Sequence, residues 1–262
     1  MQATLTNQHV TPVSTKFVRV INSPELVAGE EFCCKVDTAL TEIFAASGTE
    51  FKAALERTGF QLIVAPLASV ALRELAPERQ ASAHDDAFGI LFNIASGLVI
   101  VPERAVGKMA NVWHGTIAEP RALQAAIAHD ISHAFDQRVG KLLFGSPLSA
   151  QSEFRAMLLE ESRTAESAGR LDLDRQVNPY GGCLFHYLPI ASKIPDPFAD
   201  WGPRPAENPI RYAEGFAEMS ACHLGMSVVP TKLFEEICPR SFGFVGAQVA
   251  SAAHAAIKST RA

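Results

Sequence analysis

The sequence predicts an α+β fold in which a small mixed sheet is followed by a helical C-terminal half. Short apolar runs bounded by Gly or Pro lie between residues 60 and 102, which is typical of short strands. Later in the chain, apolar residues recur at the spacing of amphipathic helices. Hydrophobic residues make up 48% of the 262 residues, enough for a sizeable core. We expect a flexible N-terminal arm over residues 1–30 and one domain over residues 31–262.

The N-terminal half contains the predicted sheet. Residues 37–57 carry apolar side chains at helical spacing, and Gly48 is a candidate break in that helix. A short buried strand is expected at residues 60–64, and a helix at residues 67–86. Residues 89–101 are expected to form a β-hairpin, because two β-rich runs are joined there by a short loop that contains Gly.

The C-terminal half is predicted to be helical. Four helices are expected, at residues 120–137, 151–168, 208–225 and 245–257. Pro120 suits a first helical turn, and Gly140 suits a helix end. Asn208 is the expected N-cap of the third helix, Pro209 its first residue and Gly225 its end. We expect the Pro- and Gly-rich segment between the second and third of these helices to be a long connection within one domain, not a linker between two.

Composition excludes several classes of protein. The net charge of −5 argues against a protein held to nucleic acid by phosphate contacts. Five cysteines form no CxxC pair, so a thiolate zinc knuckle is not expected. The N-terminus has no uninterrupted apolar run of the kind found in secretory signal peptides. The longest apolar stretch, residues 87–101, is too short to span about 30 Å of hydrocarbon. We therefore expect no nucleic-acid partner and no membrane span.

Two histidines on one predicted helix form the strongest chemical signal. The segment AIAHDISHAFD, residues 126–136, places His129 and His133 four residues apart. At about 100° per residue the two side chains point only about 40° apart, so both imidazoles can reach one metal ion. Because the chain has eight histidines, such a pair also arises by chance, and two histidines flanking a packed helix are the simpler interpretation.

A second predicted helix makes a metal site the better interpretation. The segment RYAEGFAEMSA places Glu214 and Glu218 four residues apart on a helix that is otherwise largely apolar. A catalytic zinc site needs a third protein ligand and keeps one position for water. Glu214 suits the ligand position, and Glu218 suits the support of a histidine ligand. Two acids on a solvated helix face are the alternative.

These two segments together resemble the zinc metalloprotease domain of the anthrax lethal factor family and its bacterial effector relatives. The family pattern HExGHAxD is matched by His129, His133 and Asp136, and its ExFAE helix by Glu214 and Glu218. The resemblance implies a gluzincin, a zincin-like fold with zinc held by His129, His133 and Glu214. It also implies a secreted toxin or effector that cleaves a protein substrate and is exported without a classical signal peptide. Otherwise a cytoplasmic location is expected.

The chain departs from the family pattern at three points. Asp130 replaces the Glu that acts as general base, and Ser132 replaces Gly. The 81 residues from His133 to Glu214 exceed the usual insertion. The transition-state tyrosine of the family has no clear counterpart, and Tyr212 is the nearest candidate.

Two other functions stay open on the sequence alone. Because Asp is shorter than Glu, the chain could be a pseudoprotease that binds a protein partner without cutting it. The His129-Asp130 doublet also resembles that of HD-type metal phosphohydrolases, whose fold is all-helical and whose first histidine would be His84 or His114. Paired strands at residues 89–101 would favour the protease. A metzincin is excluded, because Asp136 and Val139 occupy positions that its motif reserves for Gly and His.

Overall fold

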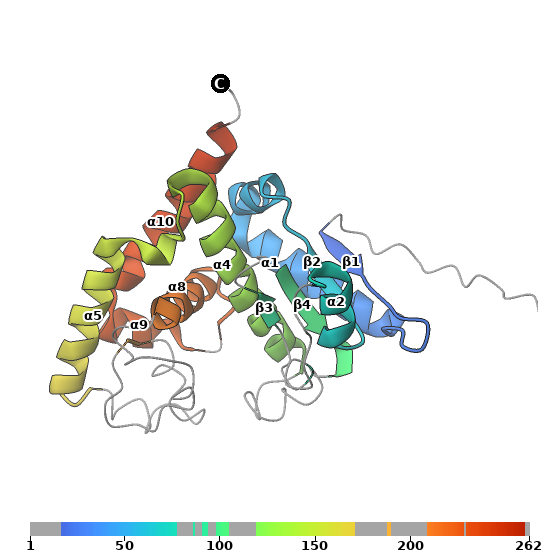
Figure 1. The fold of residues 1–262 in the computed structure, drawn as a ribbon. Helices are drawn as coiled ribbons and strands as arrows, with labels where there is room; N and C mark the ends of the chain where they lie inside the picture. The colour runs from blue at the N-terminus through green and yellow to red at the C-terminus, as the bar shows by residue number, and fades with distance from the viewer. Residues whose placement is uncertain are drawn as a thin grey trace, which may run out of the picture.

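The computed structural model describes residues 17–77, 86, 91–93, 98–104, 119–170, 188–189, 209–227 and 229–259. These residues form an α+β fold, with a small sheet and the short helix α2 on one side and a group of longer helices on the other (Figure 1). Within the described ranges, no helix has both the length and the apolar character that crossing a bilayer requires.

The sheet has four described strands in the order β1-β2-β4-β3. They are β1 (Val18–Val20), β2 (Leu62–Ala65), β4 (Leu98–Pro102) and β3 (Leu91–Asn93). The first three run parallel, and β3 lies antiparallel to β4 at the edge, with Phe92 opposite Val99. The expected hairpin is therefore confirmed, although residues 94–97 lie outside the described part. The strand predicted at residues 60–64 is also confirmed, as β2.

Both faces of the two central strands are buried, because β2 and β4 alternate their side chains between two hydrophobic clusters. Leu62 and Val64 point into the larger cluster, beneath the long helices. Ile63 and Ile100 point into a smaller cluster that α2 (Ala68–Leu75) covers with Ala71 and Leu72. Because both faces of β2 and β4 are covered, their sequences are continuous apolar runs.

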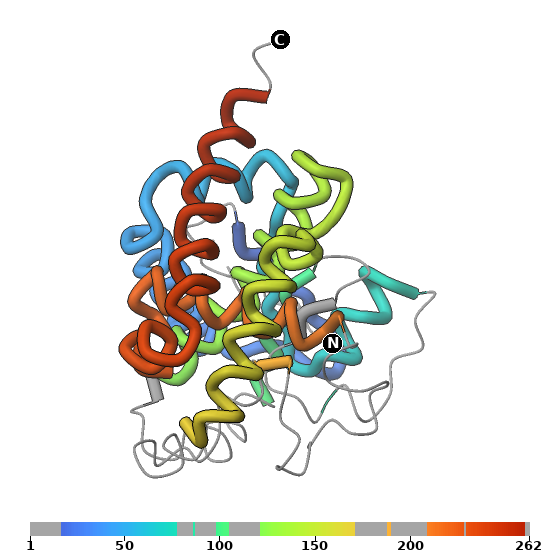
Figure 2. Tube along the Cα trace, turned by 90° about the vertical axis from the view of Figure 1, so that its left-hand side faces the viewer, coloured from blue at the N-terminus to red at the C-terminus, as the bar shows by residue number. Residues whose placement is uncertain are grey.

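The larger cluster is enclosed by helices from the whole chain. These are α1 (Glu30–Arg57), α4 (Glu119–Phe144), the short 3₁₀ helix η2 (Leu148–Ala150), α5 (Ser152–Ser167), α8 (Pro209–His223), α9 (Thr231–Ile237) and α10 (Pro239–Lys258). The most extensive helix contact joins α4 to α8, and α4 also packs on α1. Figure 2 shows α10 running the length of the helical part, and α10 packs against both α1 and α5.

Two predictions near the N-terminus were wrong. The segment expected as a flexible arm over residues 1–30 includes strand β1, which pairs with β2 from Val18 opposite Leu62. Three residues are too few for an alternating pattern to show in the sequence; residues 1–16 lie outside the described part. The first helix begins at Glu30 rather than at residue 37, and acidic residues in its first turn suit the positive end of the helix dipole. Gly48 does interrupt this helix, with a φ of 80°.

The helix that carries the histidines is longer than predicted. It continues through Gly140 to Phe144 and ends at Gly145, whose φ is +73°. Gly140 has a different role, because a Cβ there would lie 2.6 Å from the backbone nitrogen of Leu148. The glycine therefore permits the close approach of the following turn rather than ending the helix.

Other helix bounds also differ from the predictions. The helix expected at residues 67–86 ends at Leu75, and the last helix begins at Pro239 rather than near residue 245. Helix α9 was not predicted, because seven residues are too short to show periodicity. The helices expected at residues 151–168 and 208–225 are confirmed as α5 and α8.

Candidate metal centre

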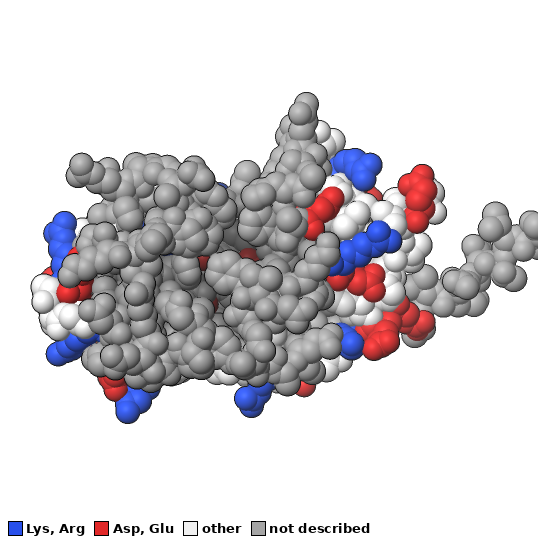
Figure 3. All heavy atoms as spheres, turned by 90° about the horizontal axis from the view of Figure 1, so that it is seen from below, with Lys and Arg blue, Asp and Glu red and all other residues white. Residues whose placement is uncertain are grey.

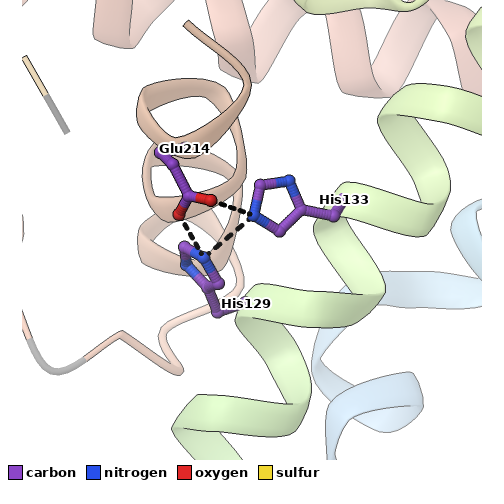
Figure 4. Close-up of side chains that lie close together, drawn as sticks. All are labelled: His129, His133 and Glu214. Carbon is purple, nitrogen blue, oxygen red and sulfur yellow. Dashed lines mark hydrogen bonds and ion pairs between the residues drawn. The ribbon is translucent and has the colours of Figure 1, made fainter. Parts of the chain in front are cut away.

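Helices α4 and α8 bring His129, His133 and Glu214 together. Figure 4 shows the two imidazole rings and the carboxylate pointing toward one another from the two helices. The Nε2 atoms of His129 and His133 lie 3.1 Å apart. The Glu214 carboxylate lies 3.1 Å from His129 Nε2 and 3.4 Å from His133 Nε2. All three residues of the predicted ligand set therefore converge.

The geometry of this group suits a small cation. In a tetrahedral zinc site with bonds of about 2.0–2.2 Å, two ligand atoms lie roughly 3.3–3.5 Å apart. The Nε2 atoms of His129 and His133 lie 3.1 Å apart, and Glu214 Oε2 lies 3.1 Å from His129 Nε2, both within a few tenths of an ångström of that value. The other oxygen, Glu214 Oε1, is the one that lies 3.4 Å from His133 Nε2. His129, His133 and Glu214 could thus hold a metal ion.

Glu218 supports the first histidine from behind. Its Oε2 lies 2.6 Å from His129 Nδ1, and the Glu218 side chain is only 3% exposed. Because the carboxylate accepts the Nδ1–H, the Nε2 lone pair of a neutral His129 faces His133 and Glu214. The other Glu218 oxygen accepts a hydrogen bond from the Ser227 hydroxyl. Glu218 thus lies beside the candidate ligand His129 rather than among the three candidate ligands.

The protonation of the group follows from its mutual contacts. Burial alone would lower the pKa of His129, but hydrogen bonds and charges from Glu214 and Glu218 outweigh burial and hold it well above its ordinary value. Burial would raise the pKa of both glutamates, yet His133 and His129 hold the pKa of Glu214 below the usual range, and His129 and Ser227 lower that of Glu218. Both carboxylates are therefore ionised at neutral pH and available to a cation.

Asp130 follows His129 on α4, and its carboxyl group interacts electrostatically with His129, His133 and Glu214. Burial raises the pKa of Asp130 to about 6, although the charges of His129 and His133 act in the opposite direction. Its carboxyl group accepts no hydrogen bond from the described part of the chain. A carboxylate with this pKa is ionised above pH 6 and is close to the value that suits a general base at neutral pH.

Asp136 bonds to Ser149 and is not among the residues that converge at the centre. It is completely buried, and its two oxygens accept hydrogen bonds from Ser149 N–H and Ser149 Oγ, each at 2.7 Å. Burial raises the pKa of Asp136 to about 6 in spite of these hydrogen bonds. Asp136 therefore fastens the turn after α4 to the helix that carries the histidines.

Three other side chains on α4 and α8 have contacts of their own. His223 contacts the Phe242 carbonyl through Nε2 at 2.8 Å, and its ring stacks on Phe242. Tyr212 is 5% exposed, with the Arg155 guanidinium 5.2 Å from the centre of its ring. The Ser132 hydroxyl donates a hydrogen bond to the Ala128 carbonyl, one turn earlier on the same helix.

Other residues are either outside the described part or were missed. His84 and His114, the candidates for the phosphohydrolase interpretation, lie outside the described residues. The contacts of Ser149 and Ser227 were not predicted, because a single serine in a turn belongs to no pattern that indicates its partner. In comparisons with known proteins, no family model matches the chain, and no significant match is found among curated proteins.

Proposed function

We propose that the chain is a zinc-dependent endopeptidase with a zincin-like domain, acting on a protein substrate. The observation that supports this most directly is the convergence of His129, His133 and Glu214, with Glu218 on the far nitrogen of His129. Two imidazoles and one carboxylate are the ligand set of a catalytic zinc site that keeps one position open. Glu214 is 32% exposed, so the group can be reached from outside.

Within this proposal each residue has a distinct task. Bound zinc would polarise the scissile carbonyl and lower the pKa of a water molecule to near 7. Asp130 accepts a proton from the attacking water and passes it to the leaving amine. Glu218 holds the His129 ring in place, so that its Nε2 faces the centre.

The sheet edge offers a place for the substrate. Strand β3 is the outermost described strand beside the helix that carries the histidines, and it contacts α4. An extended peptide can pair with such an edge strand through its backbone. At the margins of the face in Figure 3, described acidic and basic side chains lie near one another.

A second candidate is a pseudoprotease that binds zinc and a protein partner without cleavage. The observation that favours it is Asp130, which is one methylene shorter than Glu and sets its carboxylate back by about 1.5 Å. A misplacement of about 1 Å can reduce a rate about 100-fold. The HD-type phosphohydrolase is less well supported, because residues 91–93 and 98–102 are paired strands rather than helices.

The test combines metal content with cleavage. Wild type, Asp130→Asn, Asp130→Glu and His129→Ala are assayed for zinc by elemental mass spectrometry and for cleavage of a denatured protein, with chelator controls. The protease predicts cleavage by wild type and none by Asp130→Asn, although that variant keeps its zinc. The pseudoprotease predicts an inert wild type and measurable cleavage by Asp130→Glu. Wild type without zinc after loading would overturn both.

A further inference from the structure

The support of His129 extends one residue beyond Glu218. Glu218 is almost fully buried, and each of its two oxygens has a separate partner. One oxygen accepts from His129 Nδ1 at 2.6 Å, and the other accepts from Ser227 Oγ. In the described part of the chain, Ser227 is the residue that satisfies this second oxygen. Two anchors on opposite oxygens fix the plane of a carboxylate, whereas one anchor leaves it free to rotate.

Ser227 is itself held in position from two directions. The Val229 N–H donates to Ser227 Oγ at 2.8 Å and occupies a lone pair of the hydroxyl. The Val229 carbonyl also lies 3.1 Å from Oγ, but one hydroxyl proton serves one acceptor at a time. The Glu218 carboxylate is the stronger acceptor. The hydroxyl proton is therefore directed at Glu218.

The turn after α8 explains how Ser227 can contact Glu218, which lies nine positions earlier in the chain. Gly225 has a φ of +69°, and its N–H donates to the Cys222 carbonyl. The Met226 N–H donates to the Ala221 carbonyl at 3.0 Å. These two bonds form a Schellman motif, which ends the helix and reverses the chain. Val229 is 2% exposed, so its burial anchors the far side of the turn.

We propose that Ser227 is a positioning residue of this centre, acting through Glu218 to hold His129 for the metal. The inference rests on the proposed function, since it assumes that His129 is a metal ligand. Without the hydroxyl, the Glu218 carboxylate keeps its bond to His129 but loses the contact that fixes its plane. His129 then samples orientations in which Nε2 no longer faces His133 and Glu214.

The expected effect is a loss of metal affinity. Removing a group that supports a metal ligand typically lowers affinity about 10–100-fold. Ser227→Ala is expected to lower the metal affinity about ten-fold, at the low end of this range, because Glu218 remains. Glu218→Ala is expected to lower the affinity more than Ser227→Ala does. Ser227→Thr keeps the hydroxyl and is expected to restore most of the affinity. Ser220→Ala is the matched control, because Ser220 lies on α8 with Glu218 but its hydroxyl donates to the Phe216 carbonyl instead.

The decisive measurement is a double-mutant cycle on zinc affinity, measured by competition with a chromophoric chelator. If Ser227 acts through Glu218, Ser227→Ala has no further effect once Glu218 is Ala. A merely structural serine would weaken binding equally in both backgrounds, and that result would overturn the inference. Unchanged affinity in Ser227→Ala, beside a wild type that binds zinc, would also overturn it.

The same measurements separate this inference from the proposed function. A wild type that binds zinc but cleaves nothing would refute the peptidase and leave the role of Ser227 intact if the cycle shows coupling. A wild type that binds no zinc would overturn both proposals together.

Discussion

Replacing Asp136 by Asn is expected to make the protein increasingly more stable than wild type as the pH rises. Asp136 is completely buried, and burial raises its pKa from 3.8 to about 6. A group whose folded-state pKa lies above the unfolded value contributes stability that is full below the unfolded pKa. That contribution is lost as the pH rises through the folded pKa, here about 6.

The magnitude follows from the size of the pKa shift. One pKa unit corresponds to about 1.4 kcal/mol, so the full loss is about 3 kcal/mol, of which about 2 kcal/mol falls between pH 4.5 and pH 8. Asn can keep both contacts with Ser149, since its oxygen accepts from the backbone N–H and its amide donates to the hydroxyl. The difference between variant and wild type therefore isolates the charge of Asp136.

The assay is urea unfolding of both proteins at pH 4.5, 6 and 8, with chelator present so that His133 stays free of metal. Glu235→Gln, on the exposed side of α9, controls for the loss of a surface carboxylate. A stability difference that stays constant over this pH range would refute the reasoning. If wild type instead becomes more stable relative to the variant as the pH rises, the Ser149 hydrogen bonds outweigh burial in setting the pKa of Asp136.

Three further predictions concern the site and its helix. Glu214→Ala should lose more zinc than Glu218→Ala, because a ligand outweighs its support; elemental analysis after dialysis checks this, and the reverse order would exchange their roles. The kcat/KM for peptide cleavage should fall as the pH drops through 6 or below, since Asp130 takes up a proton and a bound cation shifts its pKa downward. Gly140→Ala should lower the free energy of unfolding by about 1–3 kcal/mol, measured in urea. Gly243→Ala should raise it by up to about 1 kcal/mol, because nothing lies within 4 Å of the new Cβ.

The local part of the site could be predicted from the sequence because it depends on helix geometry alone. His129 and His133 share a face of any helix that contains them, and Glu214 and Glu218 do so as well. The meeting of the two pairs depends on how α4 packs against α8, which no local pattern encodes. It was anticipated because a catalytic zinc site needs a third protein ligand, which Glu214 suits, and because the two segments together resemble a known family.

The failures arose where tertiary contacts decide what a residue does. Gly140 carries the local signal of a helix end, yet the chain after α4 needs the space that a side chain would fill. Val18–Val20 form a strand because β2 offers its edge, which three residues cannot reveal by themselves. Ser227 reaches Glu218 only because Gly225 reverses the chain after α8.

The charges between α4 and α8 are better explained by binding than by folding. Burying an ionised group costs several kcal/mol, and apolar residues of similar size would often stabilise such an interface as well or better. With Glu214 and Glu218 ionised and His129 protonated, these three side chains carry a net charge of −1. A divalent cation that displaces the His129 proton leaves two negative charges against two positive ones. A divalent cation would therefore neutralise these three side chains completely, which a single proton does not.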